Sequence, residues 1–127
     1  MPEILVVDDS KVMRDMVVAS LRPEPGLVFT HAASGLEAIE RLSLGRFDLV
    51  VLDLNMPDMG GFEVAEFIRK QDQLRHLRIV IVTTRGDEAS RARALAAGAD
   101  RFMTKPFTPE AILGEVRGLL AKNAPAL

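Results

Sequence analysis

The sequence predicts an α/β fold with a doubly wound, five-stranded parallel sheet and five helices, arranged as a three-layer sandwich. Short runs of β-branched and aliphatic residues alternate with segments in which apolar residues recur every three or four positions. This alternation is typical of repeated βα units. Most of the short runs are continuously apolar, so helices are expected to cover both faces of the sheet.

Five segments are expected to form the strands. Most of them are runs of apolar residues, which pack well on a buried sheet, and turn residues or helical patterns separate the five. The expected strands are Glu3–Val7, Leu27–His31, Asp48–Asp53, Arg78–Val82 and Arg101–Thr104.

Five helical segments are expected between and after these strands. The first and the last show the clearest helical period. Ser10 is a natural N-terminal cap for the first helix, and Gly98 is a natural C-terminal cap for the Ala-rich fourth helix. The expected helices cover Met13–Leu21, Leu36–Leu42, Phe62–Lys70, Asp87–Ala97 and Ile112–Leu120.

Length and composition restrict the kind of protein. With 127 residues, the chain is expected to be one domain over residues 1–122 with a short tail at 123–127, and no output domain. No apolar run is long enough to cross a bilayer, and the N-terminus has no basic leader, so a cytoplasmic protein is expected without membrane partners. A net charge of −2 argues against nucleic-acid binding.

Charged and polar residues follow the predicted strands at the points where they end. Asp8 and Asp9 follow the first strand, Asp53 ends the third, Thr83 follows the fourth and Lys105 follows the fifth. Ligands of open α/β sheets bind beyond these carboxyl ends. Several carboxylates in one place require a cation, and oxygen ligands without cysteine indicate a hard ion such as Mg²⁺. Asp53 is then a candidate nucleophile for a phosphoryl group.

Together these motifs resemble the receiver domain of two-component response regulators, over essentially the whole chain. The resemblance rests on Asp8-Asp9, on Asp53 with Asn55-Met-Pro57 and Gly61, on Thr83, and on Lys105-Pro106. It implies a flavodoxin-like strand order of 2-1-3-4-5. The length is similar to that of single-domain regulators of the chemotaxis type.

The resemblance implies that Asp53 accepts phosphate from a phosphohistidine on a sensor histidine kinase or a histidine phosphotransfer protein. Asp9, Asp53 and the carbonyl group of Asn55 are then expected to bind Mg²⁺, or Mn²⁺ in its place, with Asp8 acting through water. The protein would catalyse only its own phosphorylation and dephosphorylation, and would not be an enzyme in the usual sense.

Further roles follow from the same resemblance. Lys105 and Thr83 are expected to hold the phosphoryl oxygens, and Phe102 is expected to be the aromatic residue that turns inward when Thr83 moves toward the phosphate. The Lys105–Pro106 bond is expected to be cis. Partners are expected on the face formed by the fourth helix, the fifth strand and the fifth helix.

Positions two residues after Asp53 and Thr83 are expected to set the lifetime of the phosphorylated state. They hold Asn55 and Arg85, which flank the path of an attacking water. Thr84 is bulkier than the small residue often found in the family and is expected to narrow access to Asp53.

Three other functions compete with a signalling receiver. A Mg²⁺-dependent phosphohydrolase could use an aspartyl-phosphate, although Asn55 stands where that chemistry usually needs a second acid. A carrier in a multistep phosphorelay would use the same residues. A flavin-binding protein of similar topology is disfavoured because Asp8 and Asp9 would repel the cofactor phosphate. Neither His31 nor His76 is given a chemical role.

Overall fold

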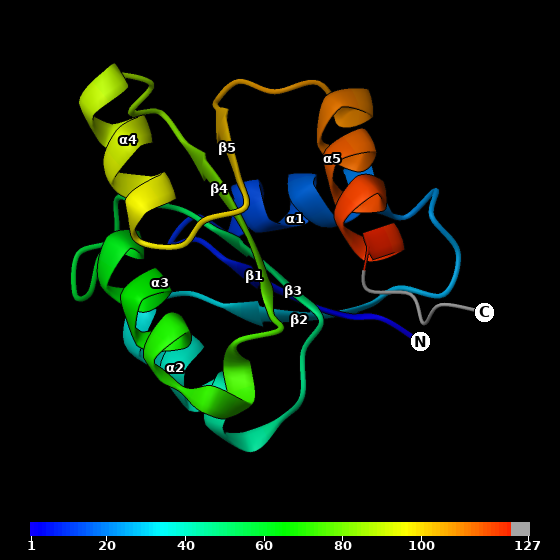
Figure 1. Cartoon of the computed structure of the whole chain (residues 1–127). Coiled ribbons are helices and arrows are strands. Elements are labelled where there is room, and N and C mark those ends of the chain that lie inside the picture. The colour runs from blue at the N-terminus through cyan, green and yellow to red at the C-terminus, as the bar shows by residue number, and fades with distance from the viewer. Residues whose placement is uncertain (123–127) are drawn as a thin grey trace.

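Five parallel strands form the centre of the molecule in the order β2-β1-β3-β4-β5, as predicted (Figure 1). The structure is a computed structural model that describes residues 1–122, so the expected tail at 123–127 lies outside the described residues. The strands are β1 (Glu3–Val7), β2 (Val28–Ala32), β3 (Leu49–Leu52), β4 (Arg78–Thr83) and β5 (Arg101–Thr104).

Three strands differ from the prediction by one residue at one or both ends. β2 begins and ends one residue late because Glu3 pairs with Val28 and Val7 with Ala32. β4 includes Thr83, which pairs with Thr104. β3 begins after Asp48 and ends before Asp53, although the Asp53 amide still donates a hydrogen bond to the Val7 carbonyl at 3.1 Å.

Helices cover both faces of the sheet. Figure 1 shows α2, α3 and α4 on one side, with α1 and α5 on the other. No helix of residues 1–122 has the length and apolar character that a membrane crossing requires. The helices are α1 (Lys11–Leu21), α2 (Gly35–Leu44), α3 (Gly61–Lys70), the single 3₁₀ turn η1 (Asp72–Leu74), α4 (Glu88–Ala96) and α5 (Pro109–Lys122).

Two hydrophobic cores lie on the two faces of the sheet because alternate strand residues point in opposite directions. In β1, Ile4 and Val6 pack with α1 and α5, whereas Leu5 and Val7 pack with α2, α3 and α4. β3 and β4 lie between neighbouring strands and are almost fully buried, which explains their uninterrupted apolar sequences.

The predicted helix caps are present. The Ser10 hydroxyl accepts a hydrogen bond from the Met13 amide at the start of α1. After α4, Gly98 has a φ of +108°, which glycine adopts without steric cost. The amides of Gly98 and Ala99 donate to the carbonyls of Leu95 and Ala94, forming a Schellman motif.

Gly61, the first residue of α3, packs directly against the backbone of Asp53. A Cβ atom at this position would clash with the carbonyl oxygen of Asp53. The preceding residue, Gly60, caps α3 without a side-chain hydrogen bond. The sequence Gly60-Gly61 therefore allows the helix to begin in contact with the residue that follows β3.

Gly61→Ala is expected to lower the free energy of unfolding by about 1–3 kcal/mol, because either α3 or Asp53 must shift to admit the methyl group. Gly118→Ala is the matched control in α5, where an added Cβ meets no atom within 4 Å. It should raise stability by about 0.5–1 kcal/mol. Urea unfolding of both variants measures the difference, and equal stability of Gly61→Ala and wild type would contradict the close contact.

Candidate functional site

Three carboxylates meet at the carboxyl edge of the sheet, where β1 and β3 end side by side. Asp8 and Asp9 follow β1, and Asp53 follows β3. Each offers one oxygen atom, and these atoms lie within 4.8 Å of one another. Asp8 and Asp53 are each only 5% exposed, whereas Asp9 is exposed. The structure thus brings together the three acids that the sequence placed at separate strand ends.

Lys105 is the cation of this cluster. Its ammonium lies 2.7 Å from Asp8 Oδ2 and 3.6 Å from Asp53 Oδ1, and its side chain is 11% exposed. The Lys105 amide also donates to the Thr83 carbonyl at 2.8 Å. The Lys105–Pro106 peptide bond is cis. Lys105 thus enters the acidic cluster from β5, nearer to Asp8 than to Asp53.

Asp8 is held by contacts to both its side chain and its backbone. Its Oδ1 atom accepts from the Ser10 amide at 2.9 Å, while Oδ2 accepts from Lys105. Its carbonyl oxygen accepts from Arg14 at 2.6 Å, and its amide donates to the Ala32 carbonyl at 3.1 Å. Asp8 therefore has little freedom to move away from the other two acids.

The electrostatic environment of Asp53 disfavours its charged form. Burial raises the pKa of the Asp53 carboxyl above its ordinary value of 3.8, and the negative charges of Asp8 and Asp9 raise it further. The Lys105 ammonium acts in the opposite direction but does not outweigh burial. A bound cation would relieve the same repulsion.

The donor set fits Mg²⁺. Three carboxylate oxygens converge from Asp8, Asp9 and Asp53. Mg²⁺ prefers oxygen ligands and usually binds through one or two carboxylates together with water and phosphate oxygens. No cysteine is present in the sequence, so a thiolate ligand is excluded.

The last residue of β4 and the loop after it form a second side of the site. Thr83 is fully buried, and its hydroxyl oxygen accepts from the Arg85 amide at 3.2 Å, which leaves the hydroxyl proton available to another acceptor. The Asn55 side-chain amide lies 3.5 Å from Thr84 Oγ1. This contact links the loop after β3 to the loop after β4 at the outer side of the acidic cluster.

Arg85 and Phe102 lie farther from the acids. Arg85 is exposed, and its guanidinium is 5.8 Å from the ring centroid of Phe62 in α3. Phe102 is half-buried in β5, where Arg91 of α4 lies over its ring at 5.8 Å. Phe102 thus contacts the helix whose face is the expected partner surface.

Two side chains that bind backbone groups near this edge of the sheet were not identified from the sequence. Arg14 of α1 binds the Asp8 carbonyl, and Asp58 accepts from the amides of Gly35 and Leu36 at the start of α2. These backbone hydrogen bonds, that of Leu36 foremost, lower the pKa of Asp58. Asp58 lies more than 20 residues from the amides that it binds, and Arg14 binds a backbone carbonyl six residues away, so no local sequence pattern indicated either contact.

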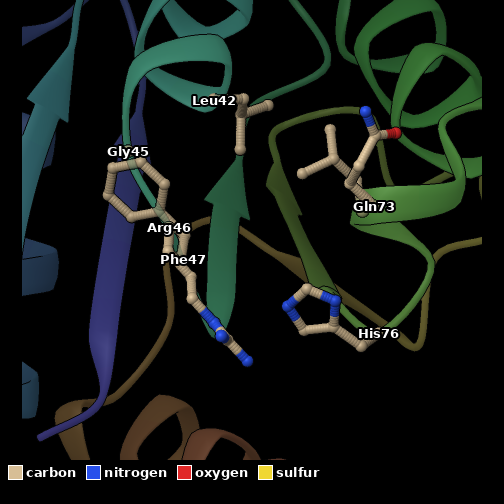
Figure 2. Close-up of a pocket in the computed structure, with 7 residues that line it drawn as sticks. Leu42, Gly45, Arg46, Phe47, Gln73 and His76 are labelled. Carbon is tan, nitrogen blue, oxygen red and sulfur yellow. The ribbon is translucent and has the colours of Figure 1, made fainter.

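A separate hollow of about 370 Å³ lies at the opposite, amino edge of the sheet. Figure 2 shows the side chains of Arg46, Gln73 and His76 around it, next to the start of β3 and the turn η1. None of the predicted site residues lines this hollow. The acidic cluster is therefore distinct from it.

Comparison with known proteins supports the same reading of the site. Residues 4–117 match the family described as response regulator receiver domain. The phosphate regulon transcriptional regulatory protein PhoB of Rhizobium meliloti is 32% identical over 125 residues, which are 98% of this chain and 55% of that protein. This chain spans about half the length of the curated relatives that it matches.

Solved structures of other signalling proteins have the same fold as this chain. The chemotaxis protein CheY4 of Vibrio cholerae is 35% identical, with a TM-score of 0.85 over 94% of this chain and 98% of that one. The receiver domain of a signal transduction histidine kinase from Syntrophus aciditrophicus is 32% identical, with a TM-score of 0.89 over 100% and 96% of the two chains. The chain therefore belongs to the response regulator receiver domain family.

Proposed function

We propose that this protein is a phosphorylation-controlled signalling module in which Asp53 accepts a phosphoryl group from a phosphohistidine. The observation that carries the proposal is the convergence of Asp8, Asp9 and Asp53 within 4.8 Å, with the Lys105 ammonium 3.6 Å from Asp53. The donor is a histidine kinase or a histidine phosphotransfer protein. Membership of the receiver family supports both parts of the proposal.

In the proposed step, a carboxylate oxygen of Asp53 attacks the phosphorus atom of the phosphohistidine. A P–O bond forms as the P–N bond breaks, and the bonding electron pair returns to the imidazole nitrogen. Mg²⁺, held by Asp9, Asp53 and the Asn55 carbonyl with Asp8 acting through water, would neutralise charge on the phosphoryl oxygens. Lys105 and the Thr83 hydroxyl would donate hydrogen bonds to the same oxygens.

A new dianion at Asp53 changes which side-chain positions are favourable. Lys105 pairs most closely with Asp8 in the present structure, and the Thr83 hydroxyl oxygen accepts from the Arg85 amide. Attraction of both groups to the phosphoryl oxygens would bias Phe102 toward an inward position. Because Phe102 packs beside Arg91 of α4, this movement would alter the surface formed by α4, β5 and α5.

The downstream partner is proposed to be a protein that binds this surface in the phosphorylated state. The likeness to the chemotaxis protein CheY4 favours a partner of the chemotaxis type. The phosphohydrolase alternative has less support, because residue 55 is an amide whose side chain contacts Thr84.

Incubation with radiolabelled acetyl phosphate tests the phosphoryl acceptor. Wild type is expected to incorporate label only with Mg²⁺, and Asp53→Asn is expected to remain at background because an amide is not a nucleophile of this kind. Asp58→Asn is the matched control, since Asp58 caps α2 outside the acidic cluster. Equal labelling of wild type and Asp53→Asn would overturn the proposal.

Asp53→Asn is also expected to stabilise the metal-free protein at neutral pH. Because the pKa of Asp53 is raised by folding, the folded state binds more protons between the unfolded and folded values, and stability falls as pH rises through that window. Asn removes this loss. Thermal unfolding in EDTA should show a higher Tm for the variant at pH 7 and no difference below about pH 4.

Glu66→Gln on α3 is the control for the loss of one negative charge, because Glu66 is exposed. Its Tm should stay near that of wild type, as for most surface substitutions. A lower Tm of Asp53→Asn than of wild type at pH 7 would contradict the destabilising environment described for Asp53.

Replacement of Asn55 and Arg85 together is expected to change the lifetime of the aspartyl-phosphate. Both are exposed in the loops that follow β3 and β4, where we expect them to restrict the approach of water. The decay of labelled Asn55→Ala/Arg85→Ala after removal of acetyl phosphate measures the effect against wild type. An unchanged decay rate would show that neither side chain controls hydrolysis.

A further inference from the structure

Arg14 is a half-buried arginine in α1 that connects the ends of two strands. Its Nη1 atom donates to the Asp8 carbonyl oxygen at 2.6 Å, directly after β1. Its Nε atom donates to His31 Nδ1 at 3.2 Å, in β2. A guanidinium is planar and presents its donors in a rigid fork, so the two contacts together orient the side chain.

The contact with the Asp8 carbonyl acts on the acidic cluster through the backbone. This carbonyl belongs to the peptide group that joins Asp8 to Asp9, and both residues supply oxygen atoms to the cluster. This peptide group includes the backbone nitrogen of Asp9. A hydrogen bond that fixes its orientation therefore also limits the direction of the Asp9 side chain. Asp9 is exposed, so packing contributes less to its position than for Asp8.

His31 supports Arg14 from the neighbouring strand. A guanidinium only donates, so the Nδ1 atom of His31 must be the acceptor and carry no proton. β2 pairs with β1 through Val6 and His31, which places the imidazole beside the end of β1. His31, Arg14 and the Asp8 carbonyl thus form a chain of two hydrogen bonds that ends at the acidic cluster.

We propose that Arg14, oriented by His31, is a positioning residue that holds the Asp8–Asp9 backbone in the geometry required for divalent-cation binding. Within residues 1–122, the hydrogen bond from Arg14 to the acidic cluster goes to this carbonyl oxygen. Loss of a residue that hydrogen-bonds to a metal-binding residue commonly weakens metal affinity by ten- to a hundredfold. The proposal rests on the function given above for the role of the cation, but it concerns binding in the unphosphorylated protein.

Isothermal titration of the metal-free full chain with MgCl₂ tests the proposal. Arg14→Met is expected to weaken Mg²⁺ binding about tenfold. Arg14→Lys keeps the positive charge but lacks the fork, so it should lose most of the same affinity. Wild-type affinity in either variant would overturn the proposal, because the contact or its geometry would then be unnecessary.

A matched pair at His31 separates the hydrogen bond from general packing. His31→Asn places an oxygen acceptor close to the position of Nδ1, whereas His31→Leu has a similar shape without an acceptor. Weakened Mg²⁺ binding by His31→Leu, with recovery in His31→Asn, is expected. Equal affinities of the two would overturn the role of His31. Arg46→Met, at the opposite edge of the sheet, controls for loss of an arginine and should bind like wild type.

Urea unfolding shows whether each variant folds, and the labelling assay shows whether it still accepts a phosphoryl group. If Arg14→Met does not fold, Arg14→Lys and the His31 pair decide the outcome. At saturating Mg²⁺, labelling of Arg14→Lys should approach the wild-type rate, because the defect lies in cation affinity. If wild type is not labelled, the proposed function of Asp53 is refuted. If wild type is labelled normally and the variants bind Mg²⁺ with unchanged affinity, only the role of Arg14 is refuted.

Discussion

The placement of three carboxylates at one edge of the sheet is the constraint on which the rest of the site depends. Two like charges about 4–5 Å apart repel by roughly 3–4 kcal/mol at an effective dielectric constant near 20. Lys105 offsets part of this repulsion, but its closest contact is with Asp8 at 2.7 Å, and the pKa of Asp53 remains raised. A divalent cation or a protonated Asp53 therefore lowers the energy of the folded state.

The fold prevents the acids from relieving their repulsion by moving apart. The amides of Asp8 and Asp53 donate to the carbonyls of Ala32 and Val7, so the backbones of both residues continue the hydrogen bonding of their strands. Gly61 allows α3 to press against Asp53 from the other side. The sheet and the start of α3 therefore hold Asp8 and Asp53 close together despite their repulsion. A cation would find their carboxylates already in position.

The opposite edge of the sheet has a different balance of charge. There, Asp100 accepts from Arg69 at 3.1 Å, from Arg78 at 3.4 Å and from the Ile79 amide at 2.8 Å. Arg69 also donates to the carbonyls of Leu77 and Gly98. At the amino edge one acid pairs with two arginines, whereas at the carboxyl edge one lysine pairs with two of three clustered acids. The two ends of the same strands therefore differ in how completely their acids are paired.

The sequence by itself determined the fold class, the order of elements and the site acids, because apolar periodicity defines strands and helices and parallel strands end at a common edge. Asp8, Asp9, Asp53 and Lys105 could be grouped on that basis alone. Only the tertiary structure decided that Lys105 lies closer to Asp8 than to Asp53, that Asp58 caps α2, and that Arg14 links His31 to Asp8. These contacts depend on side-chain directions and on distances between segments 6 to 97 residues apart, which no local pattern specifies.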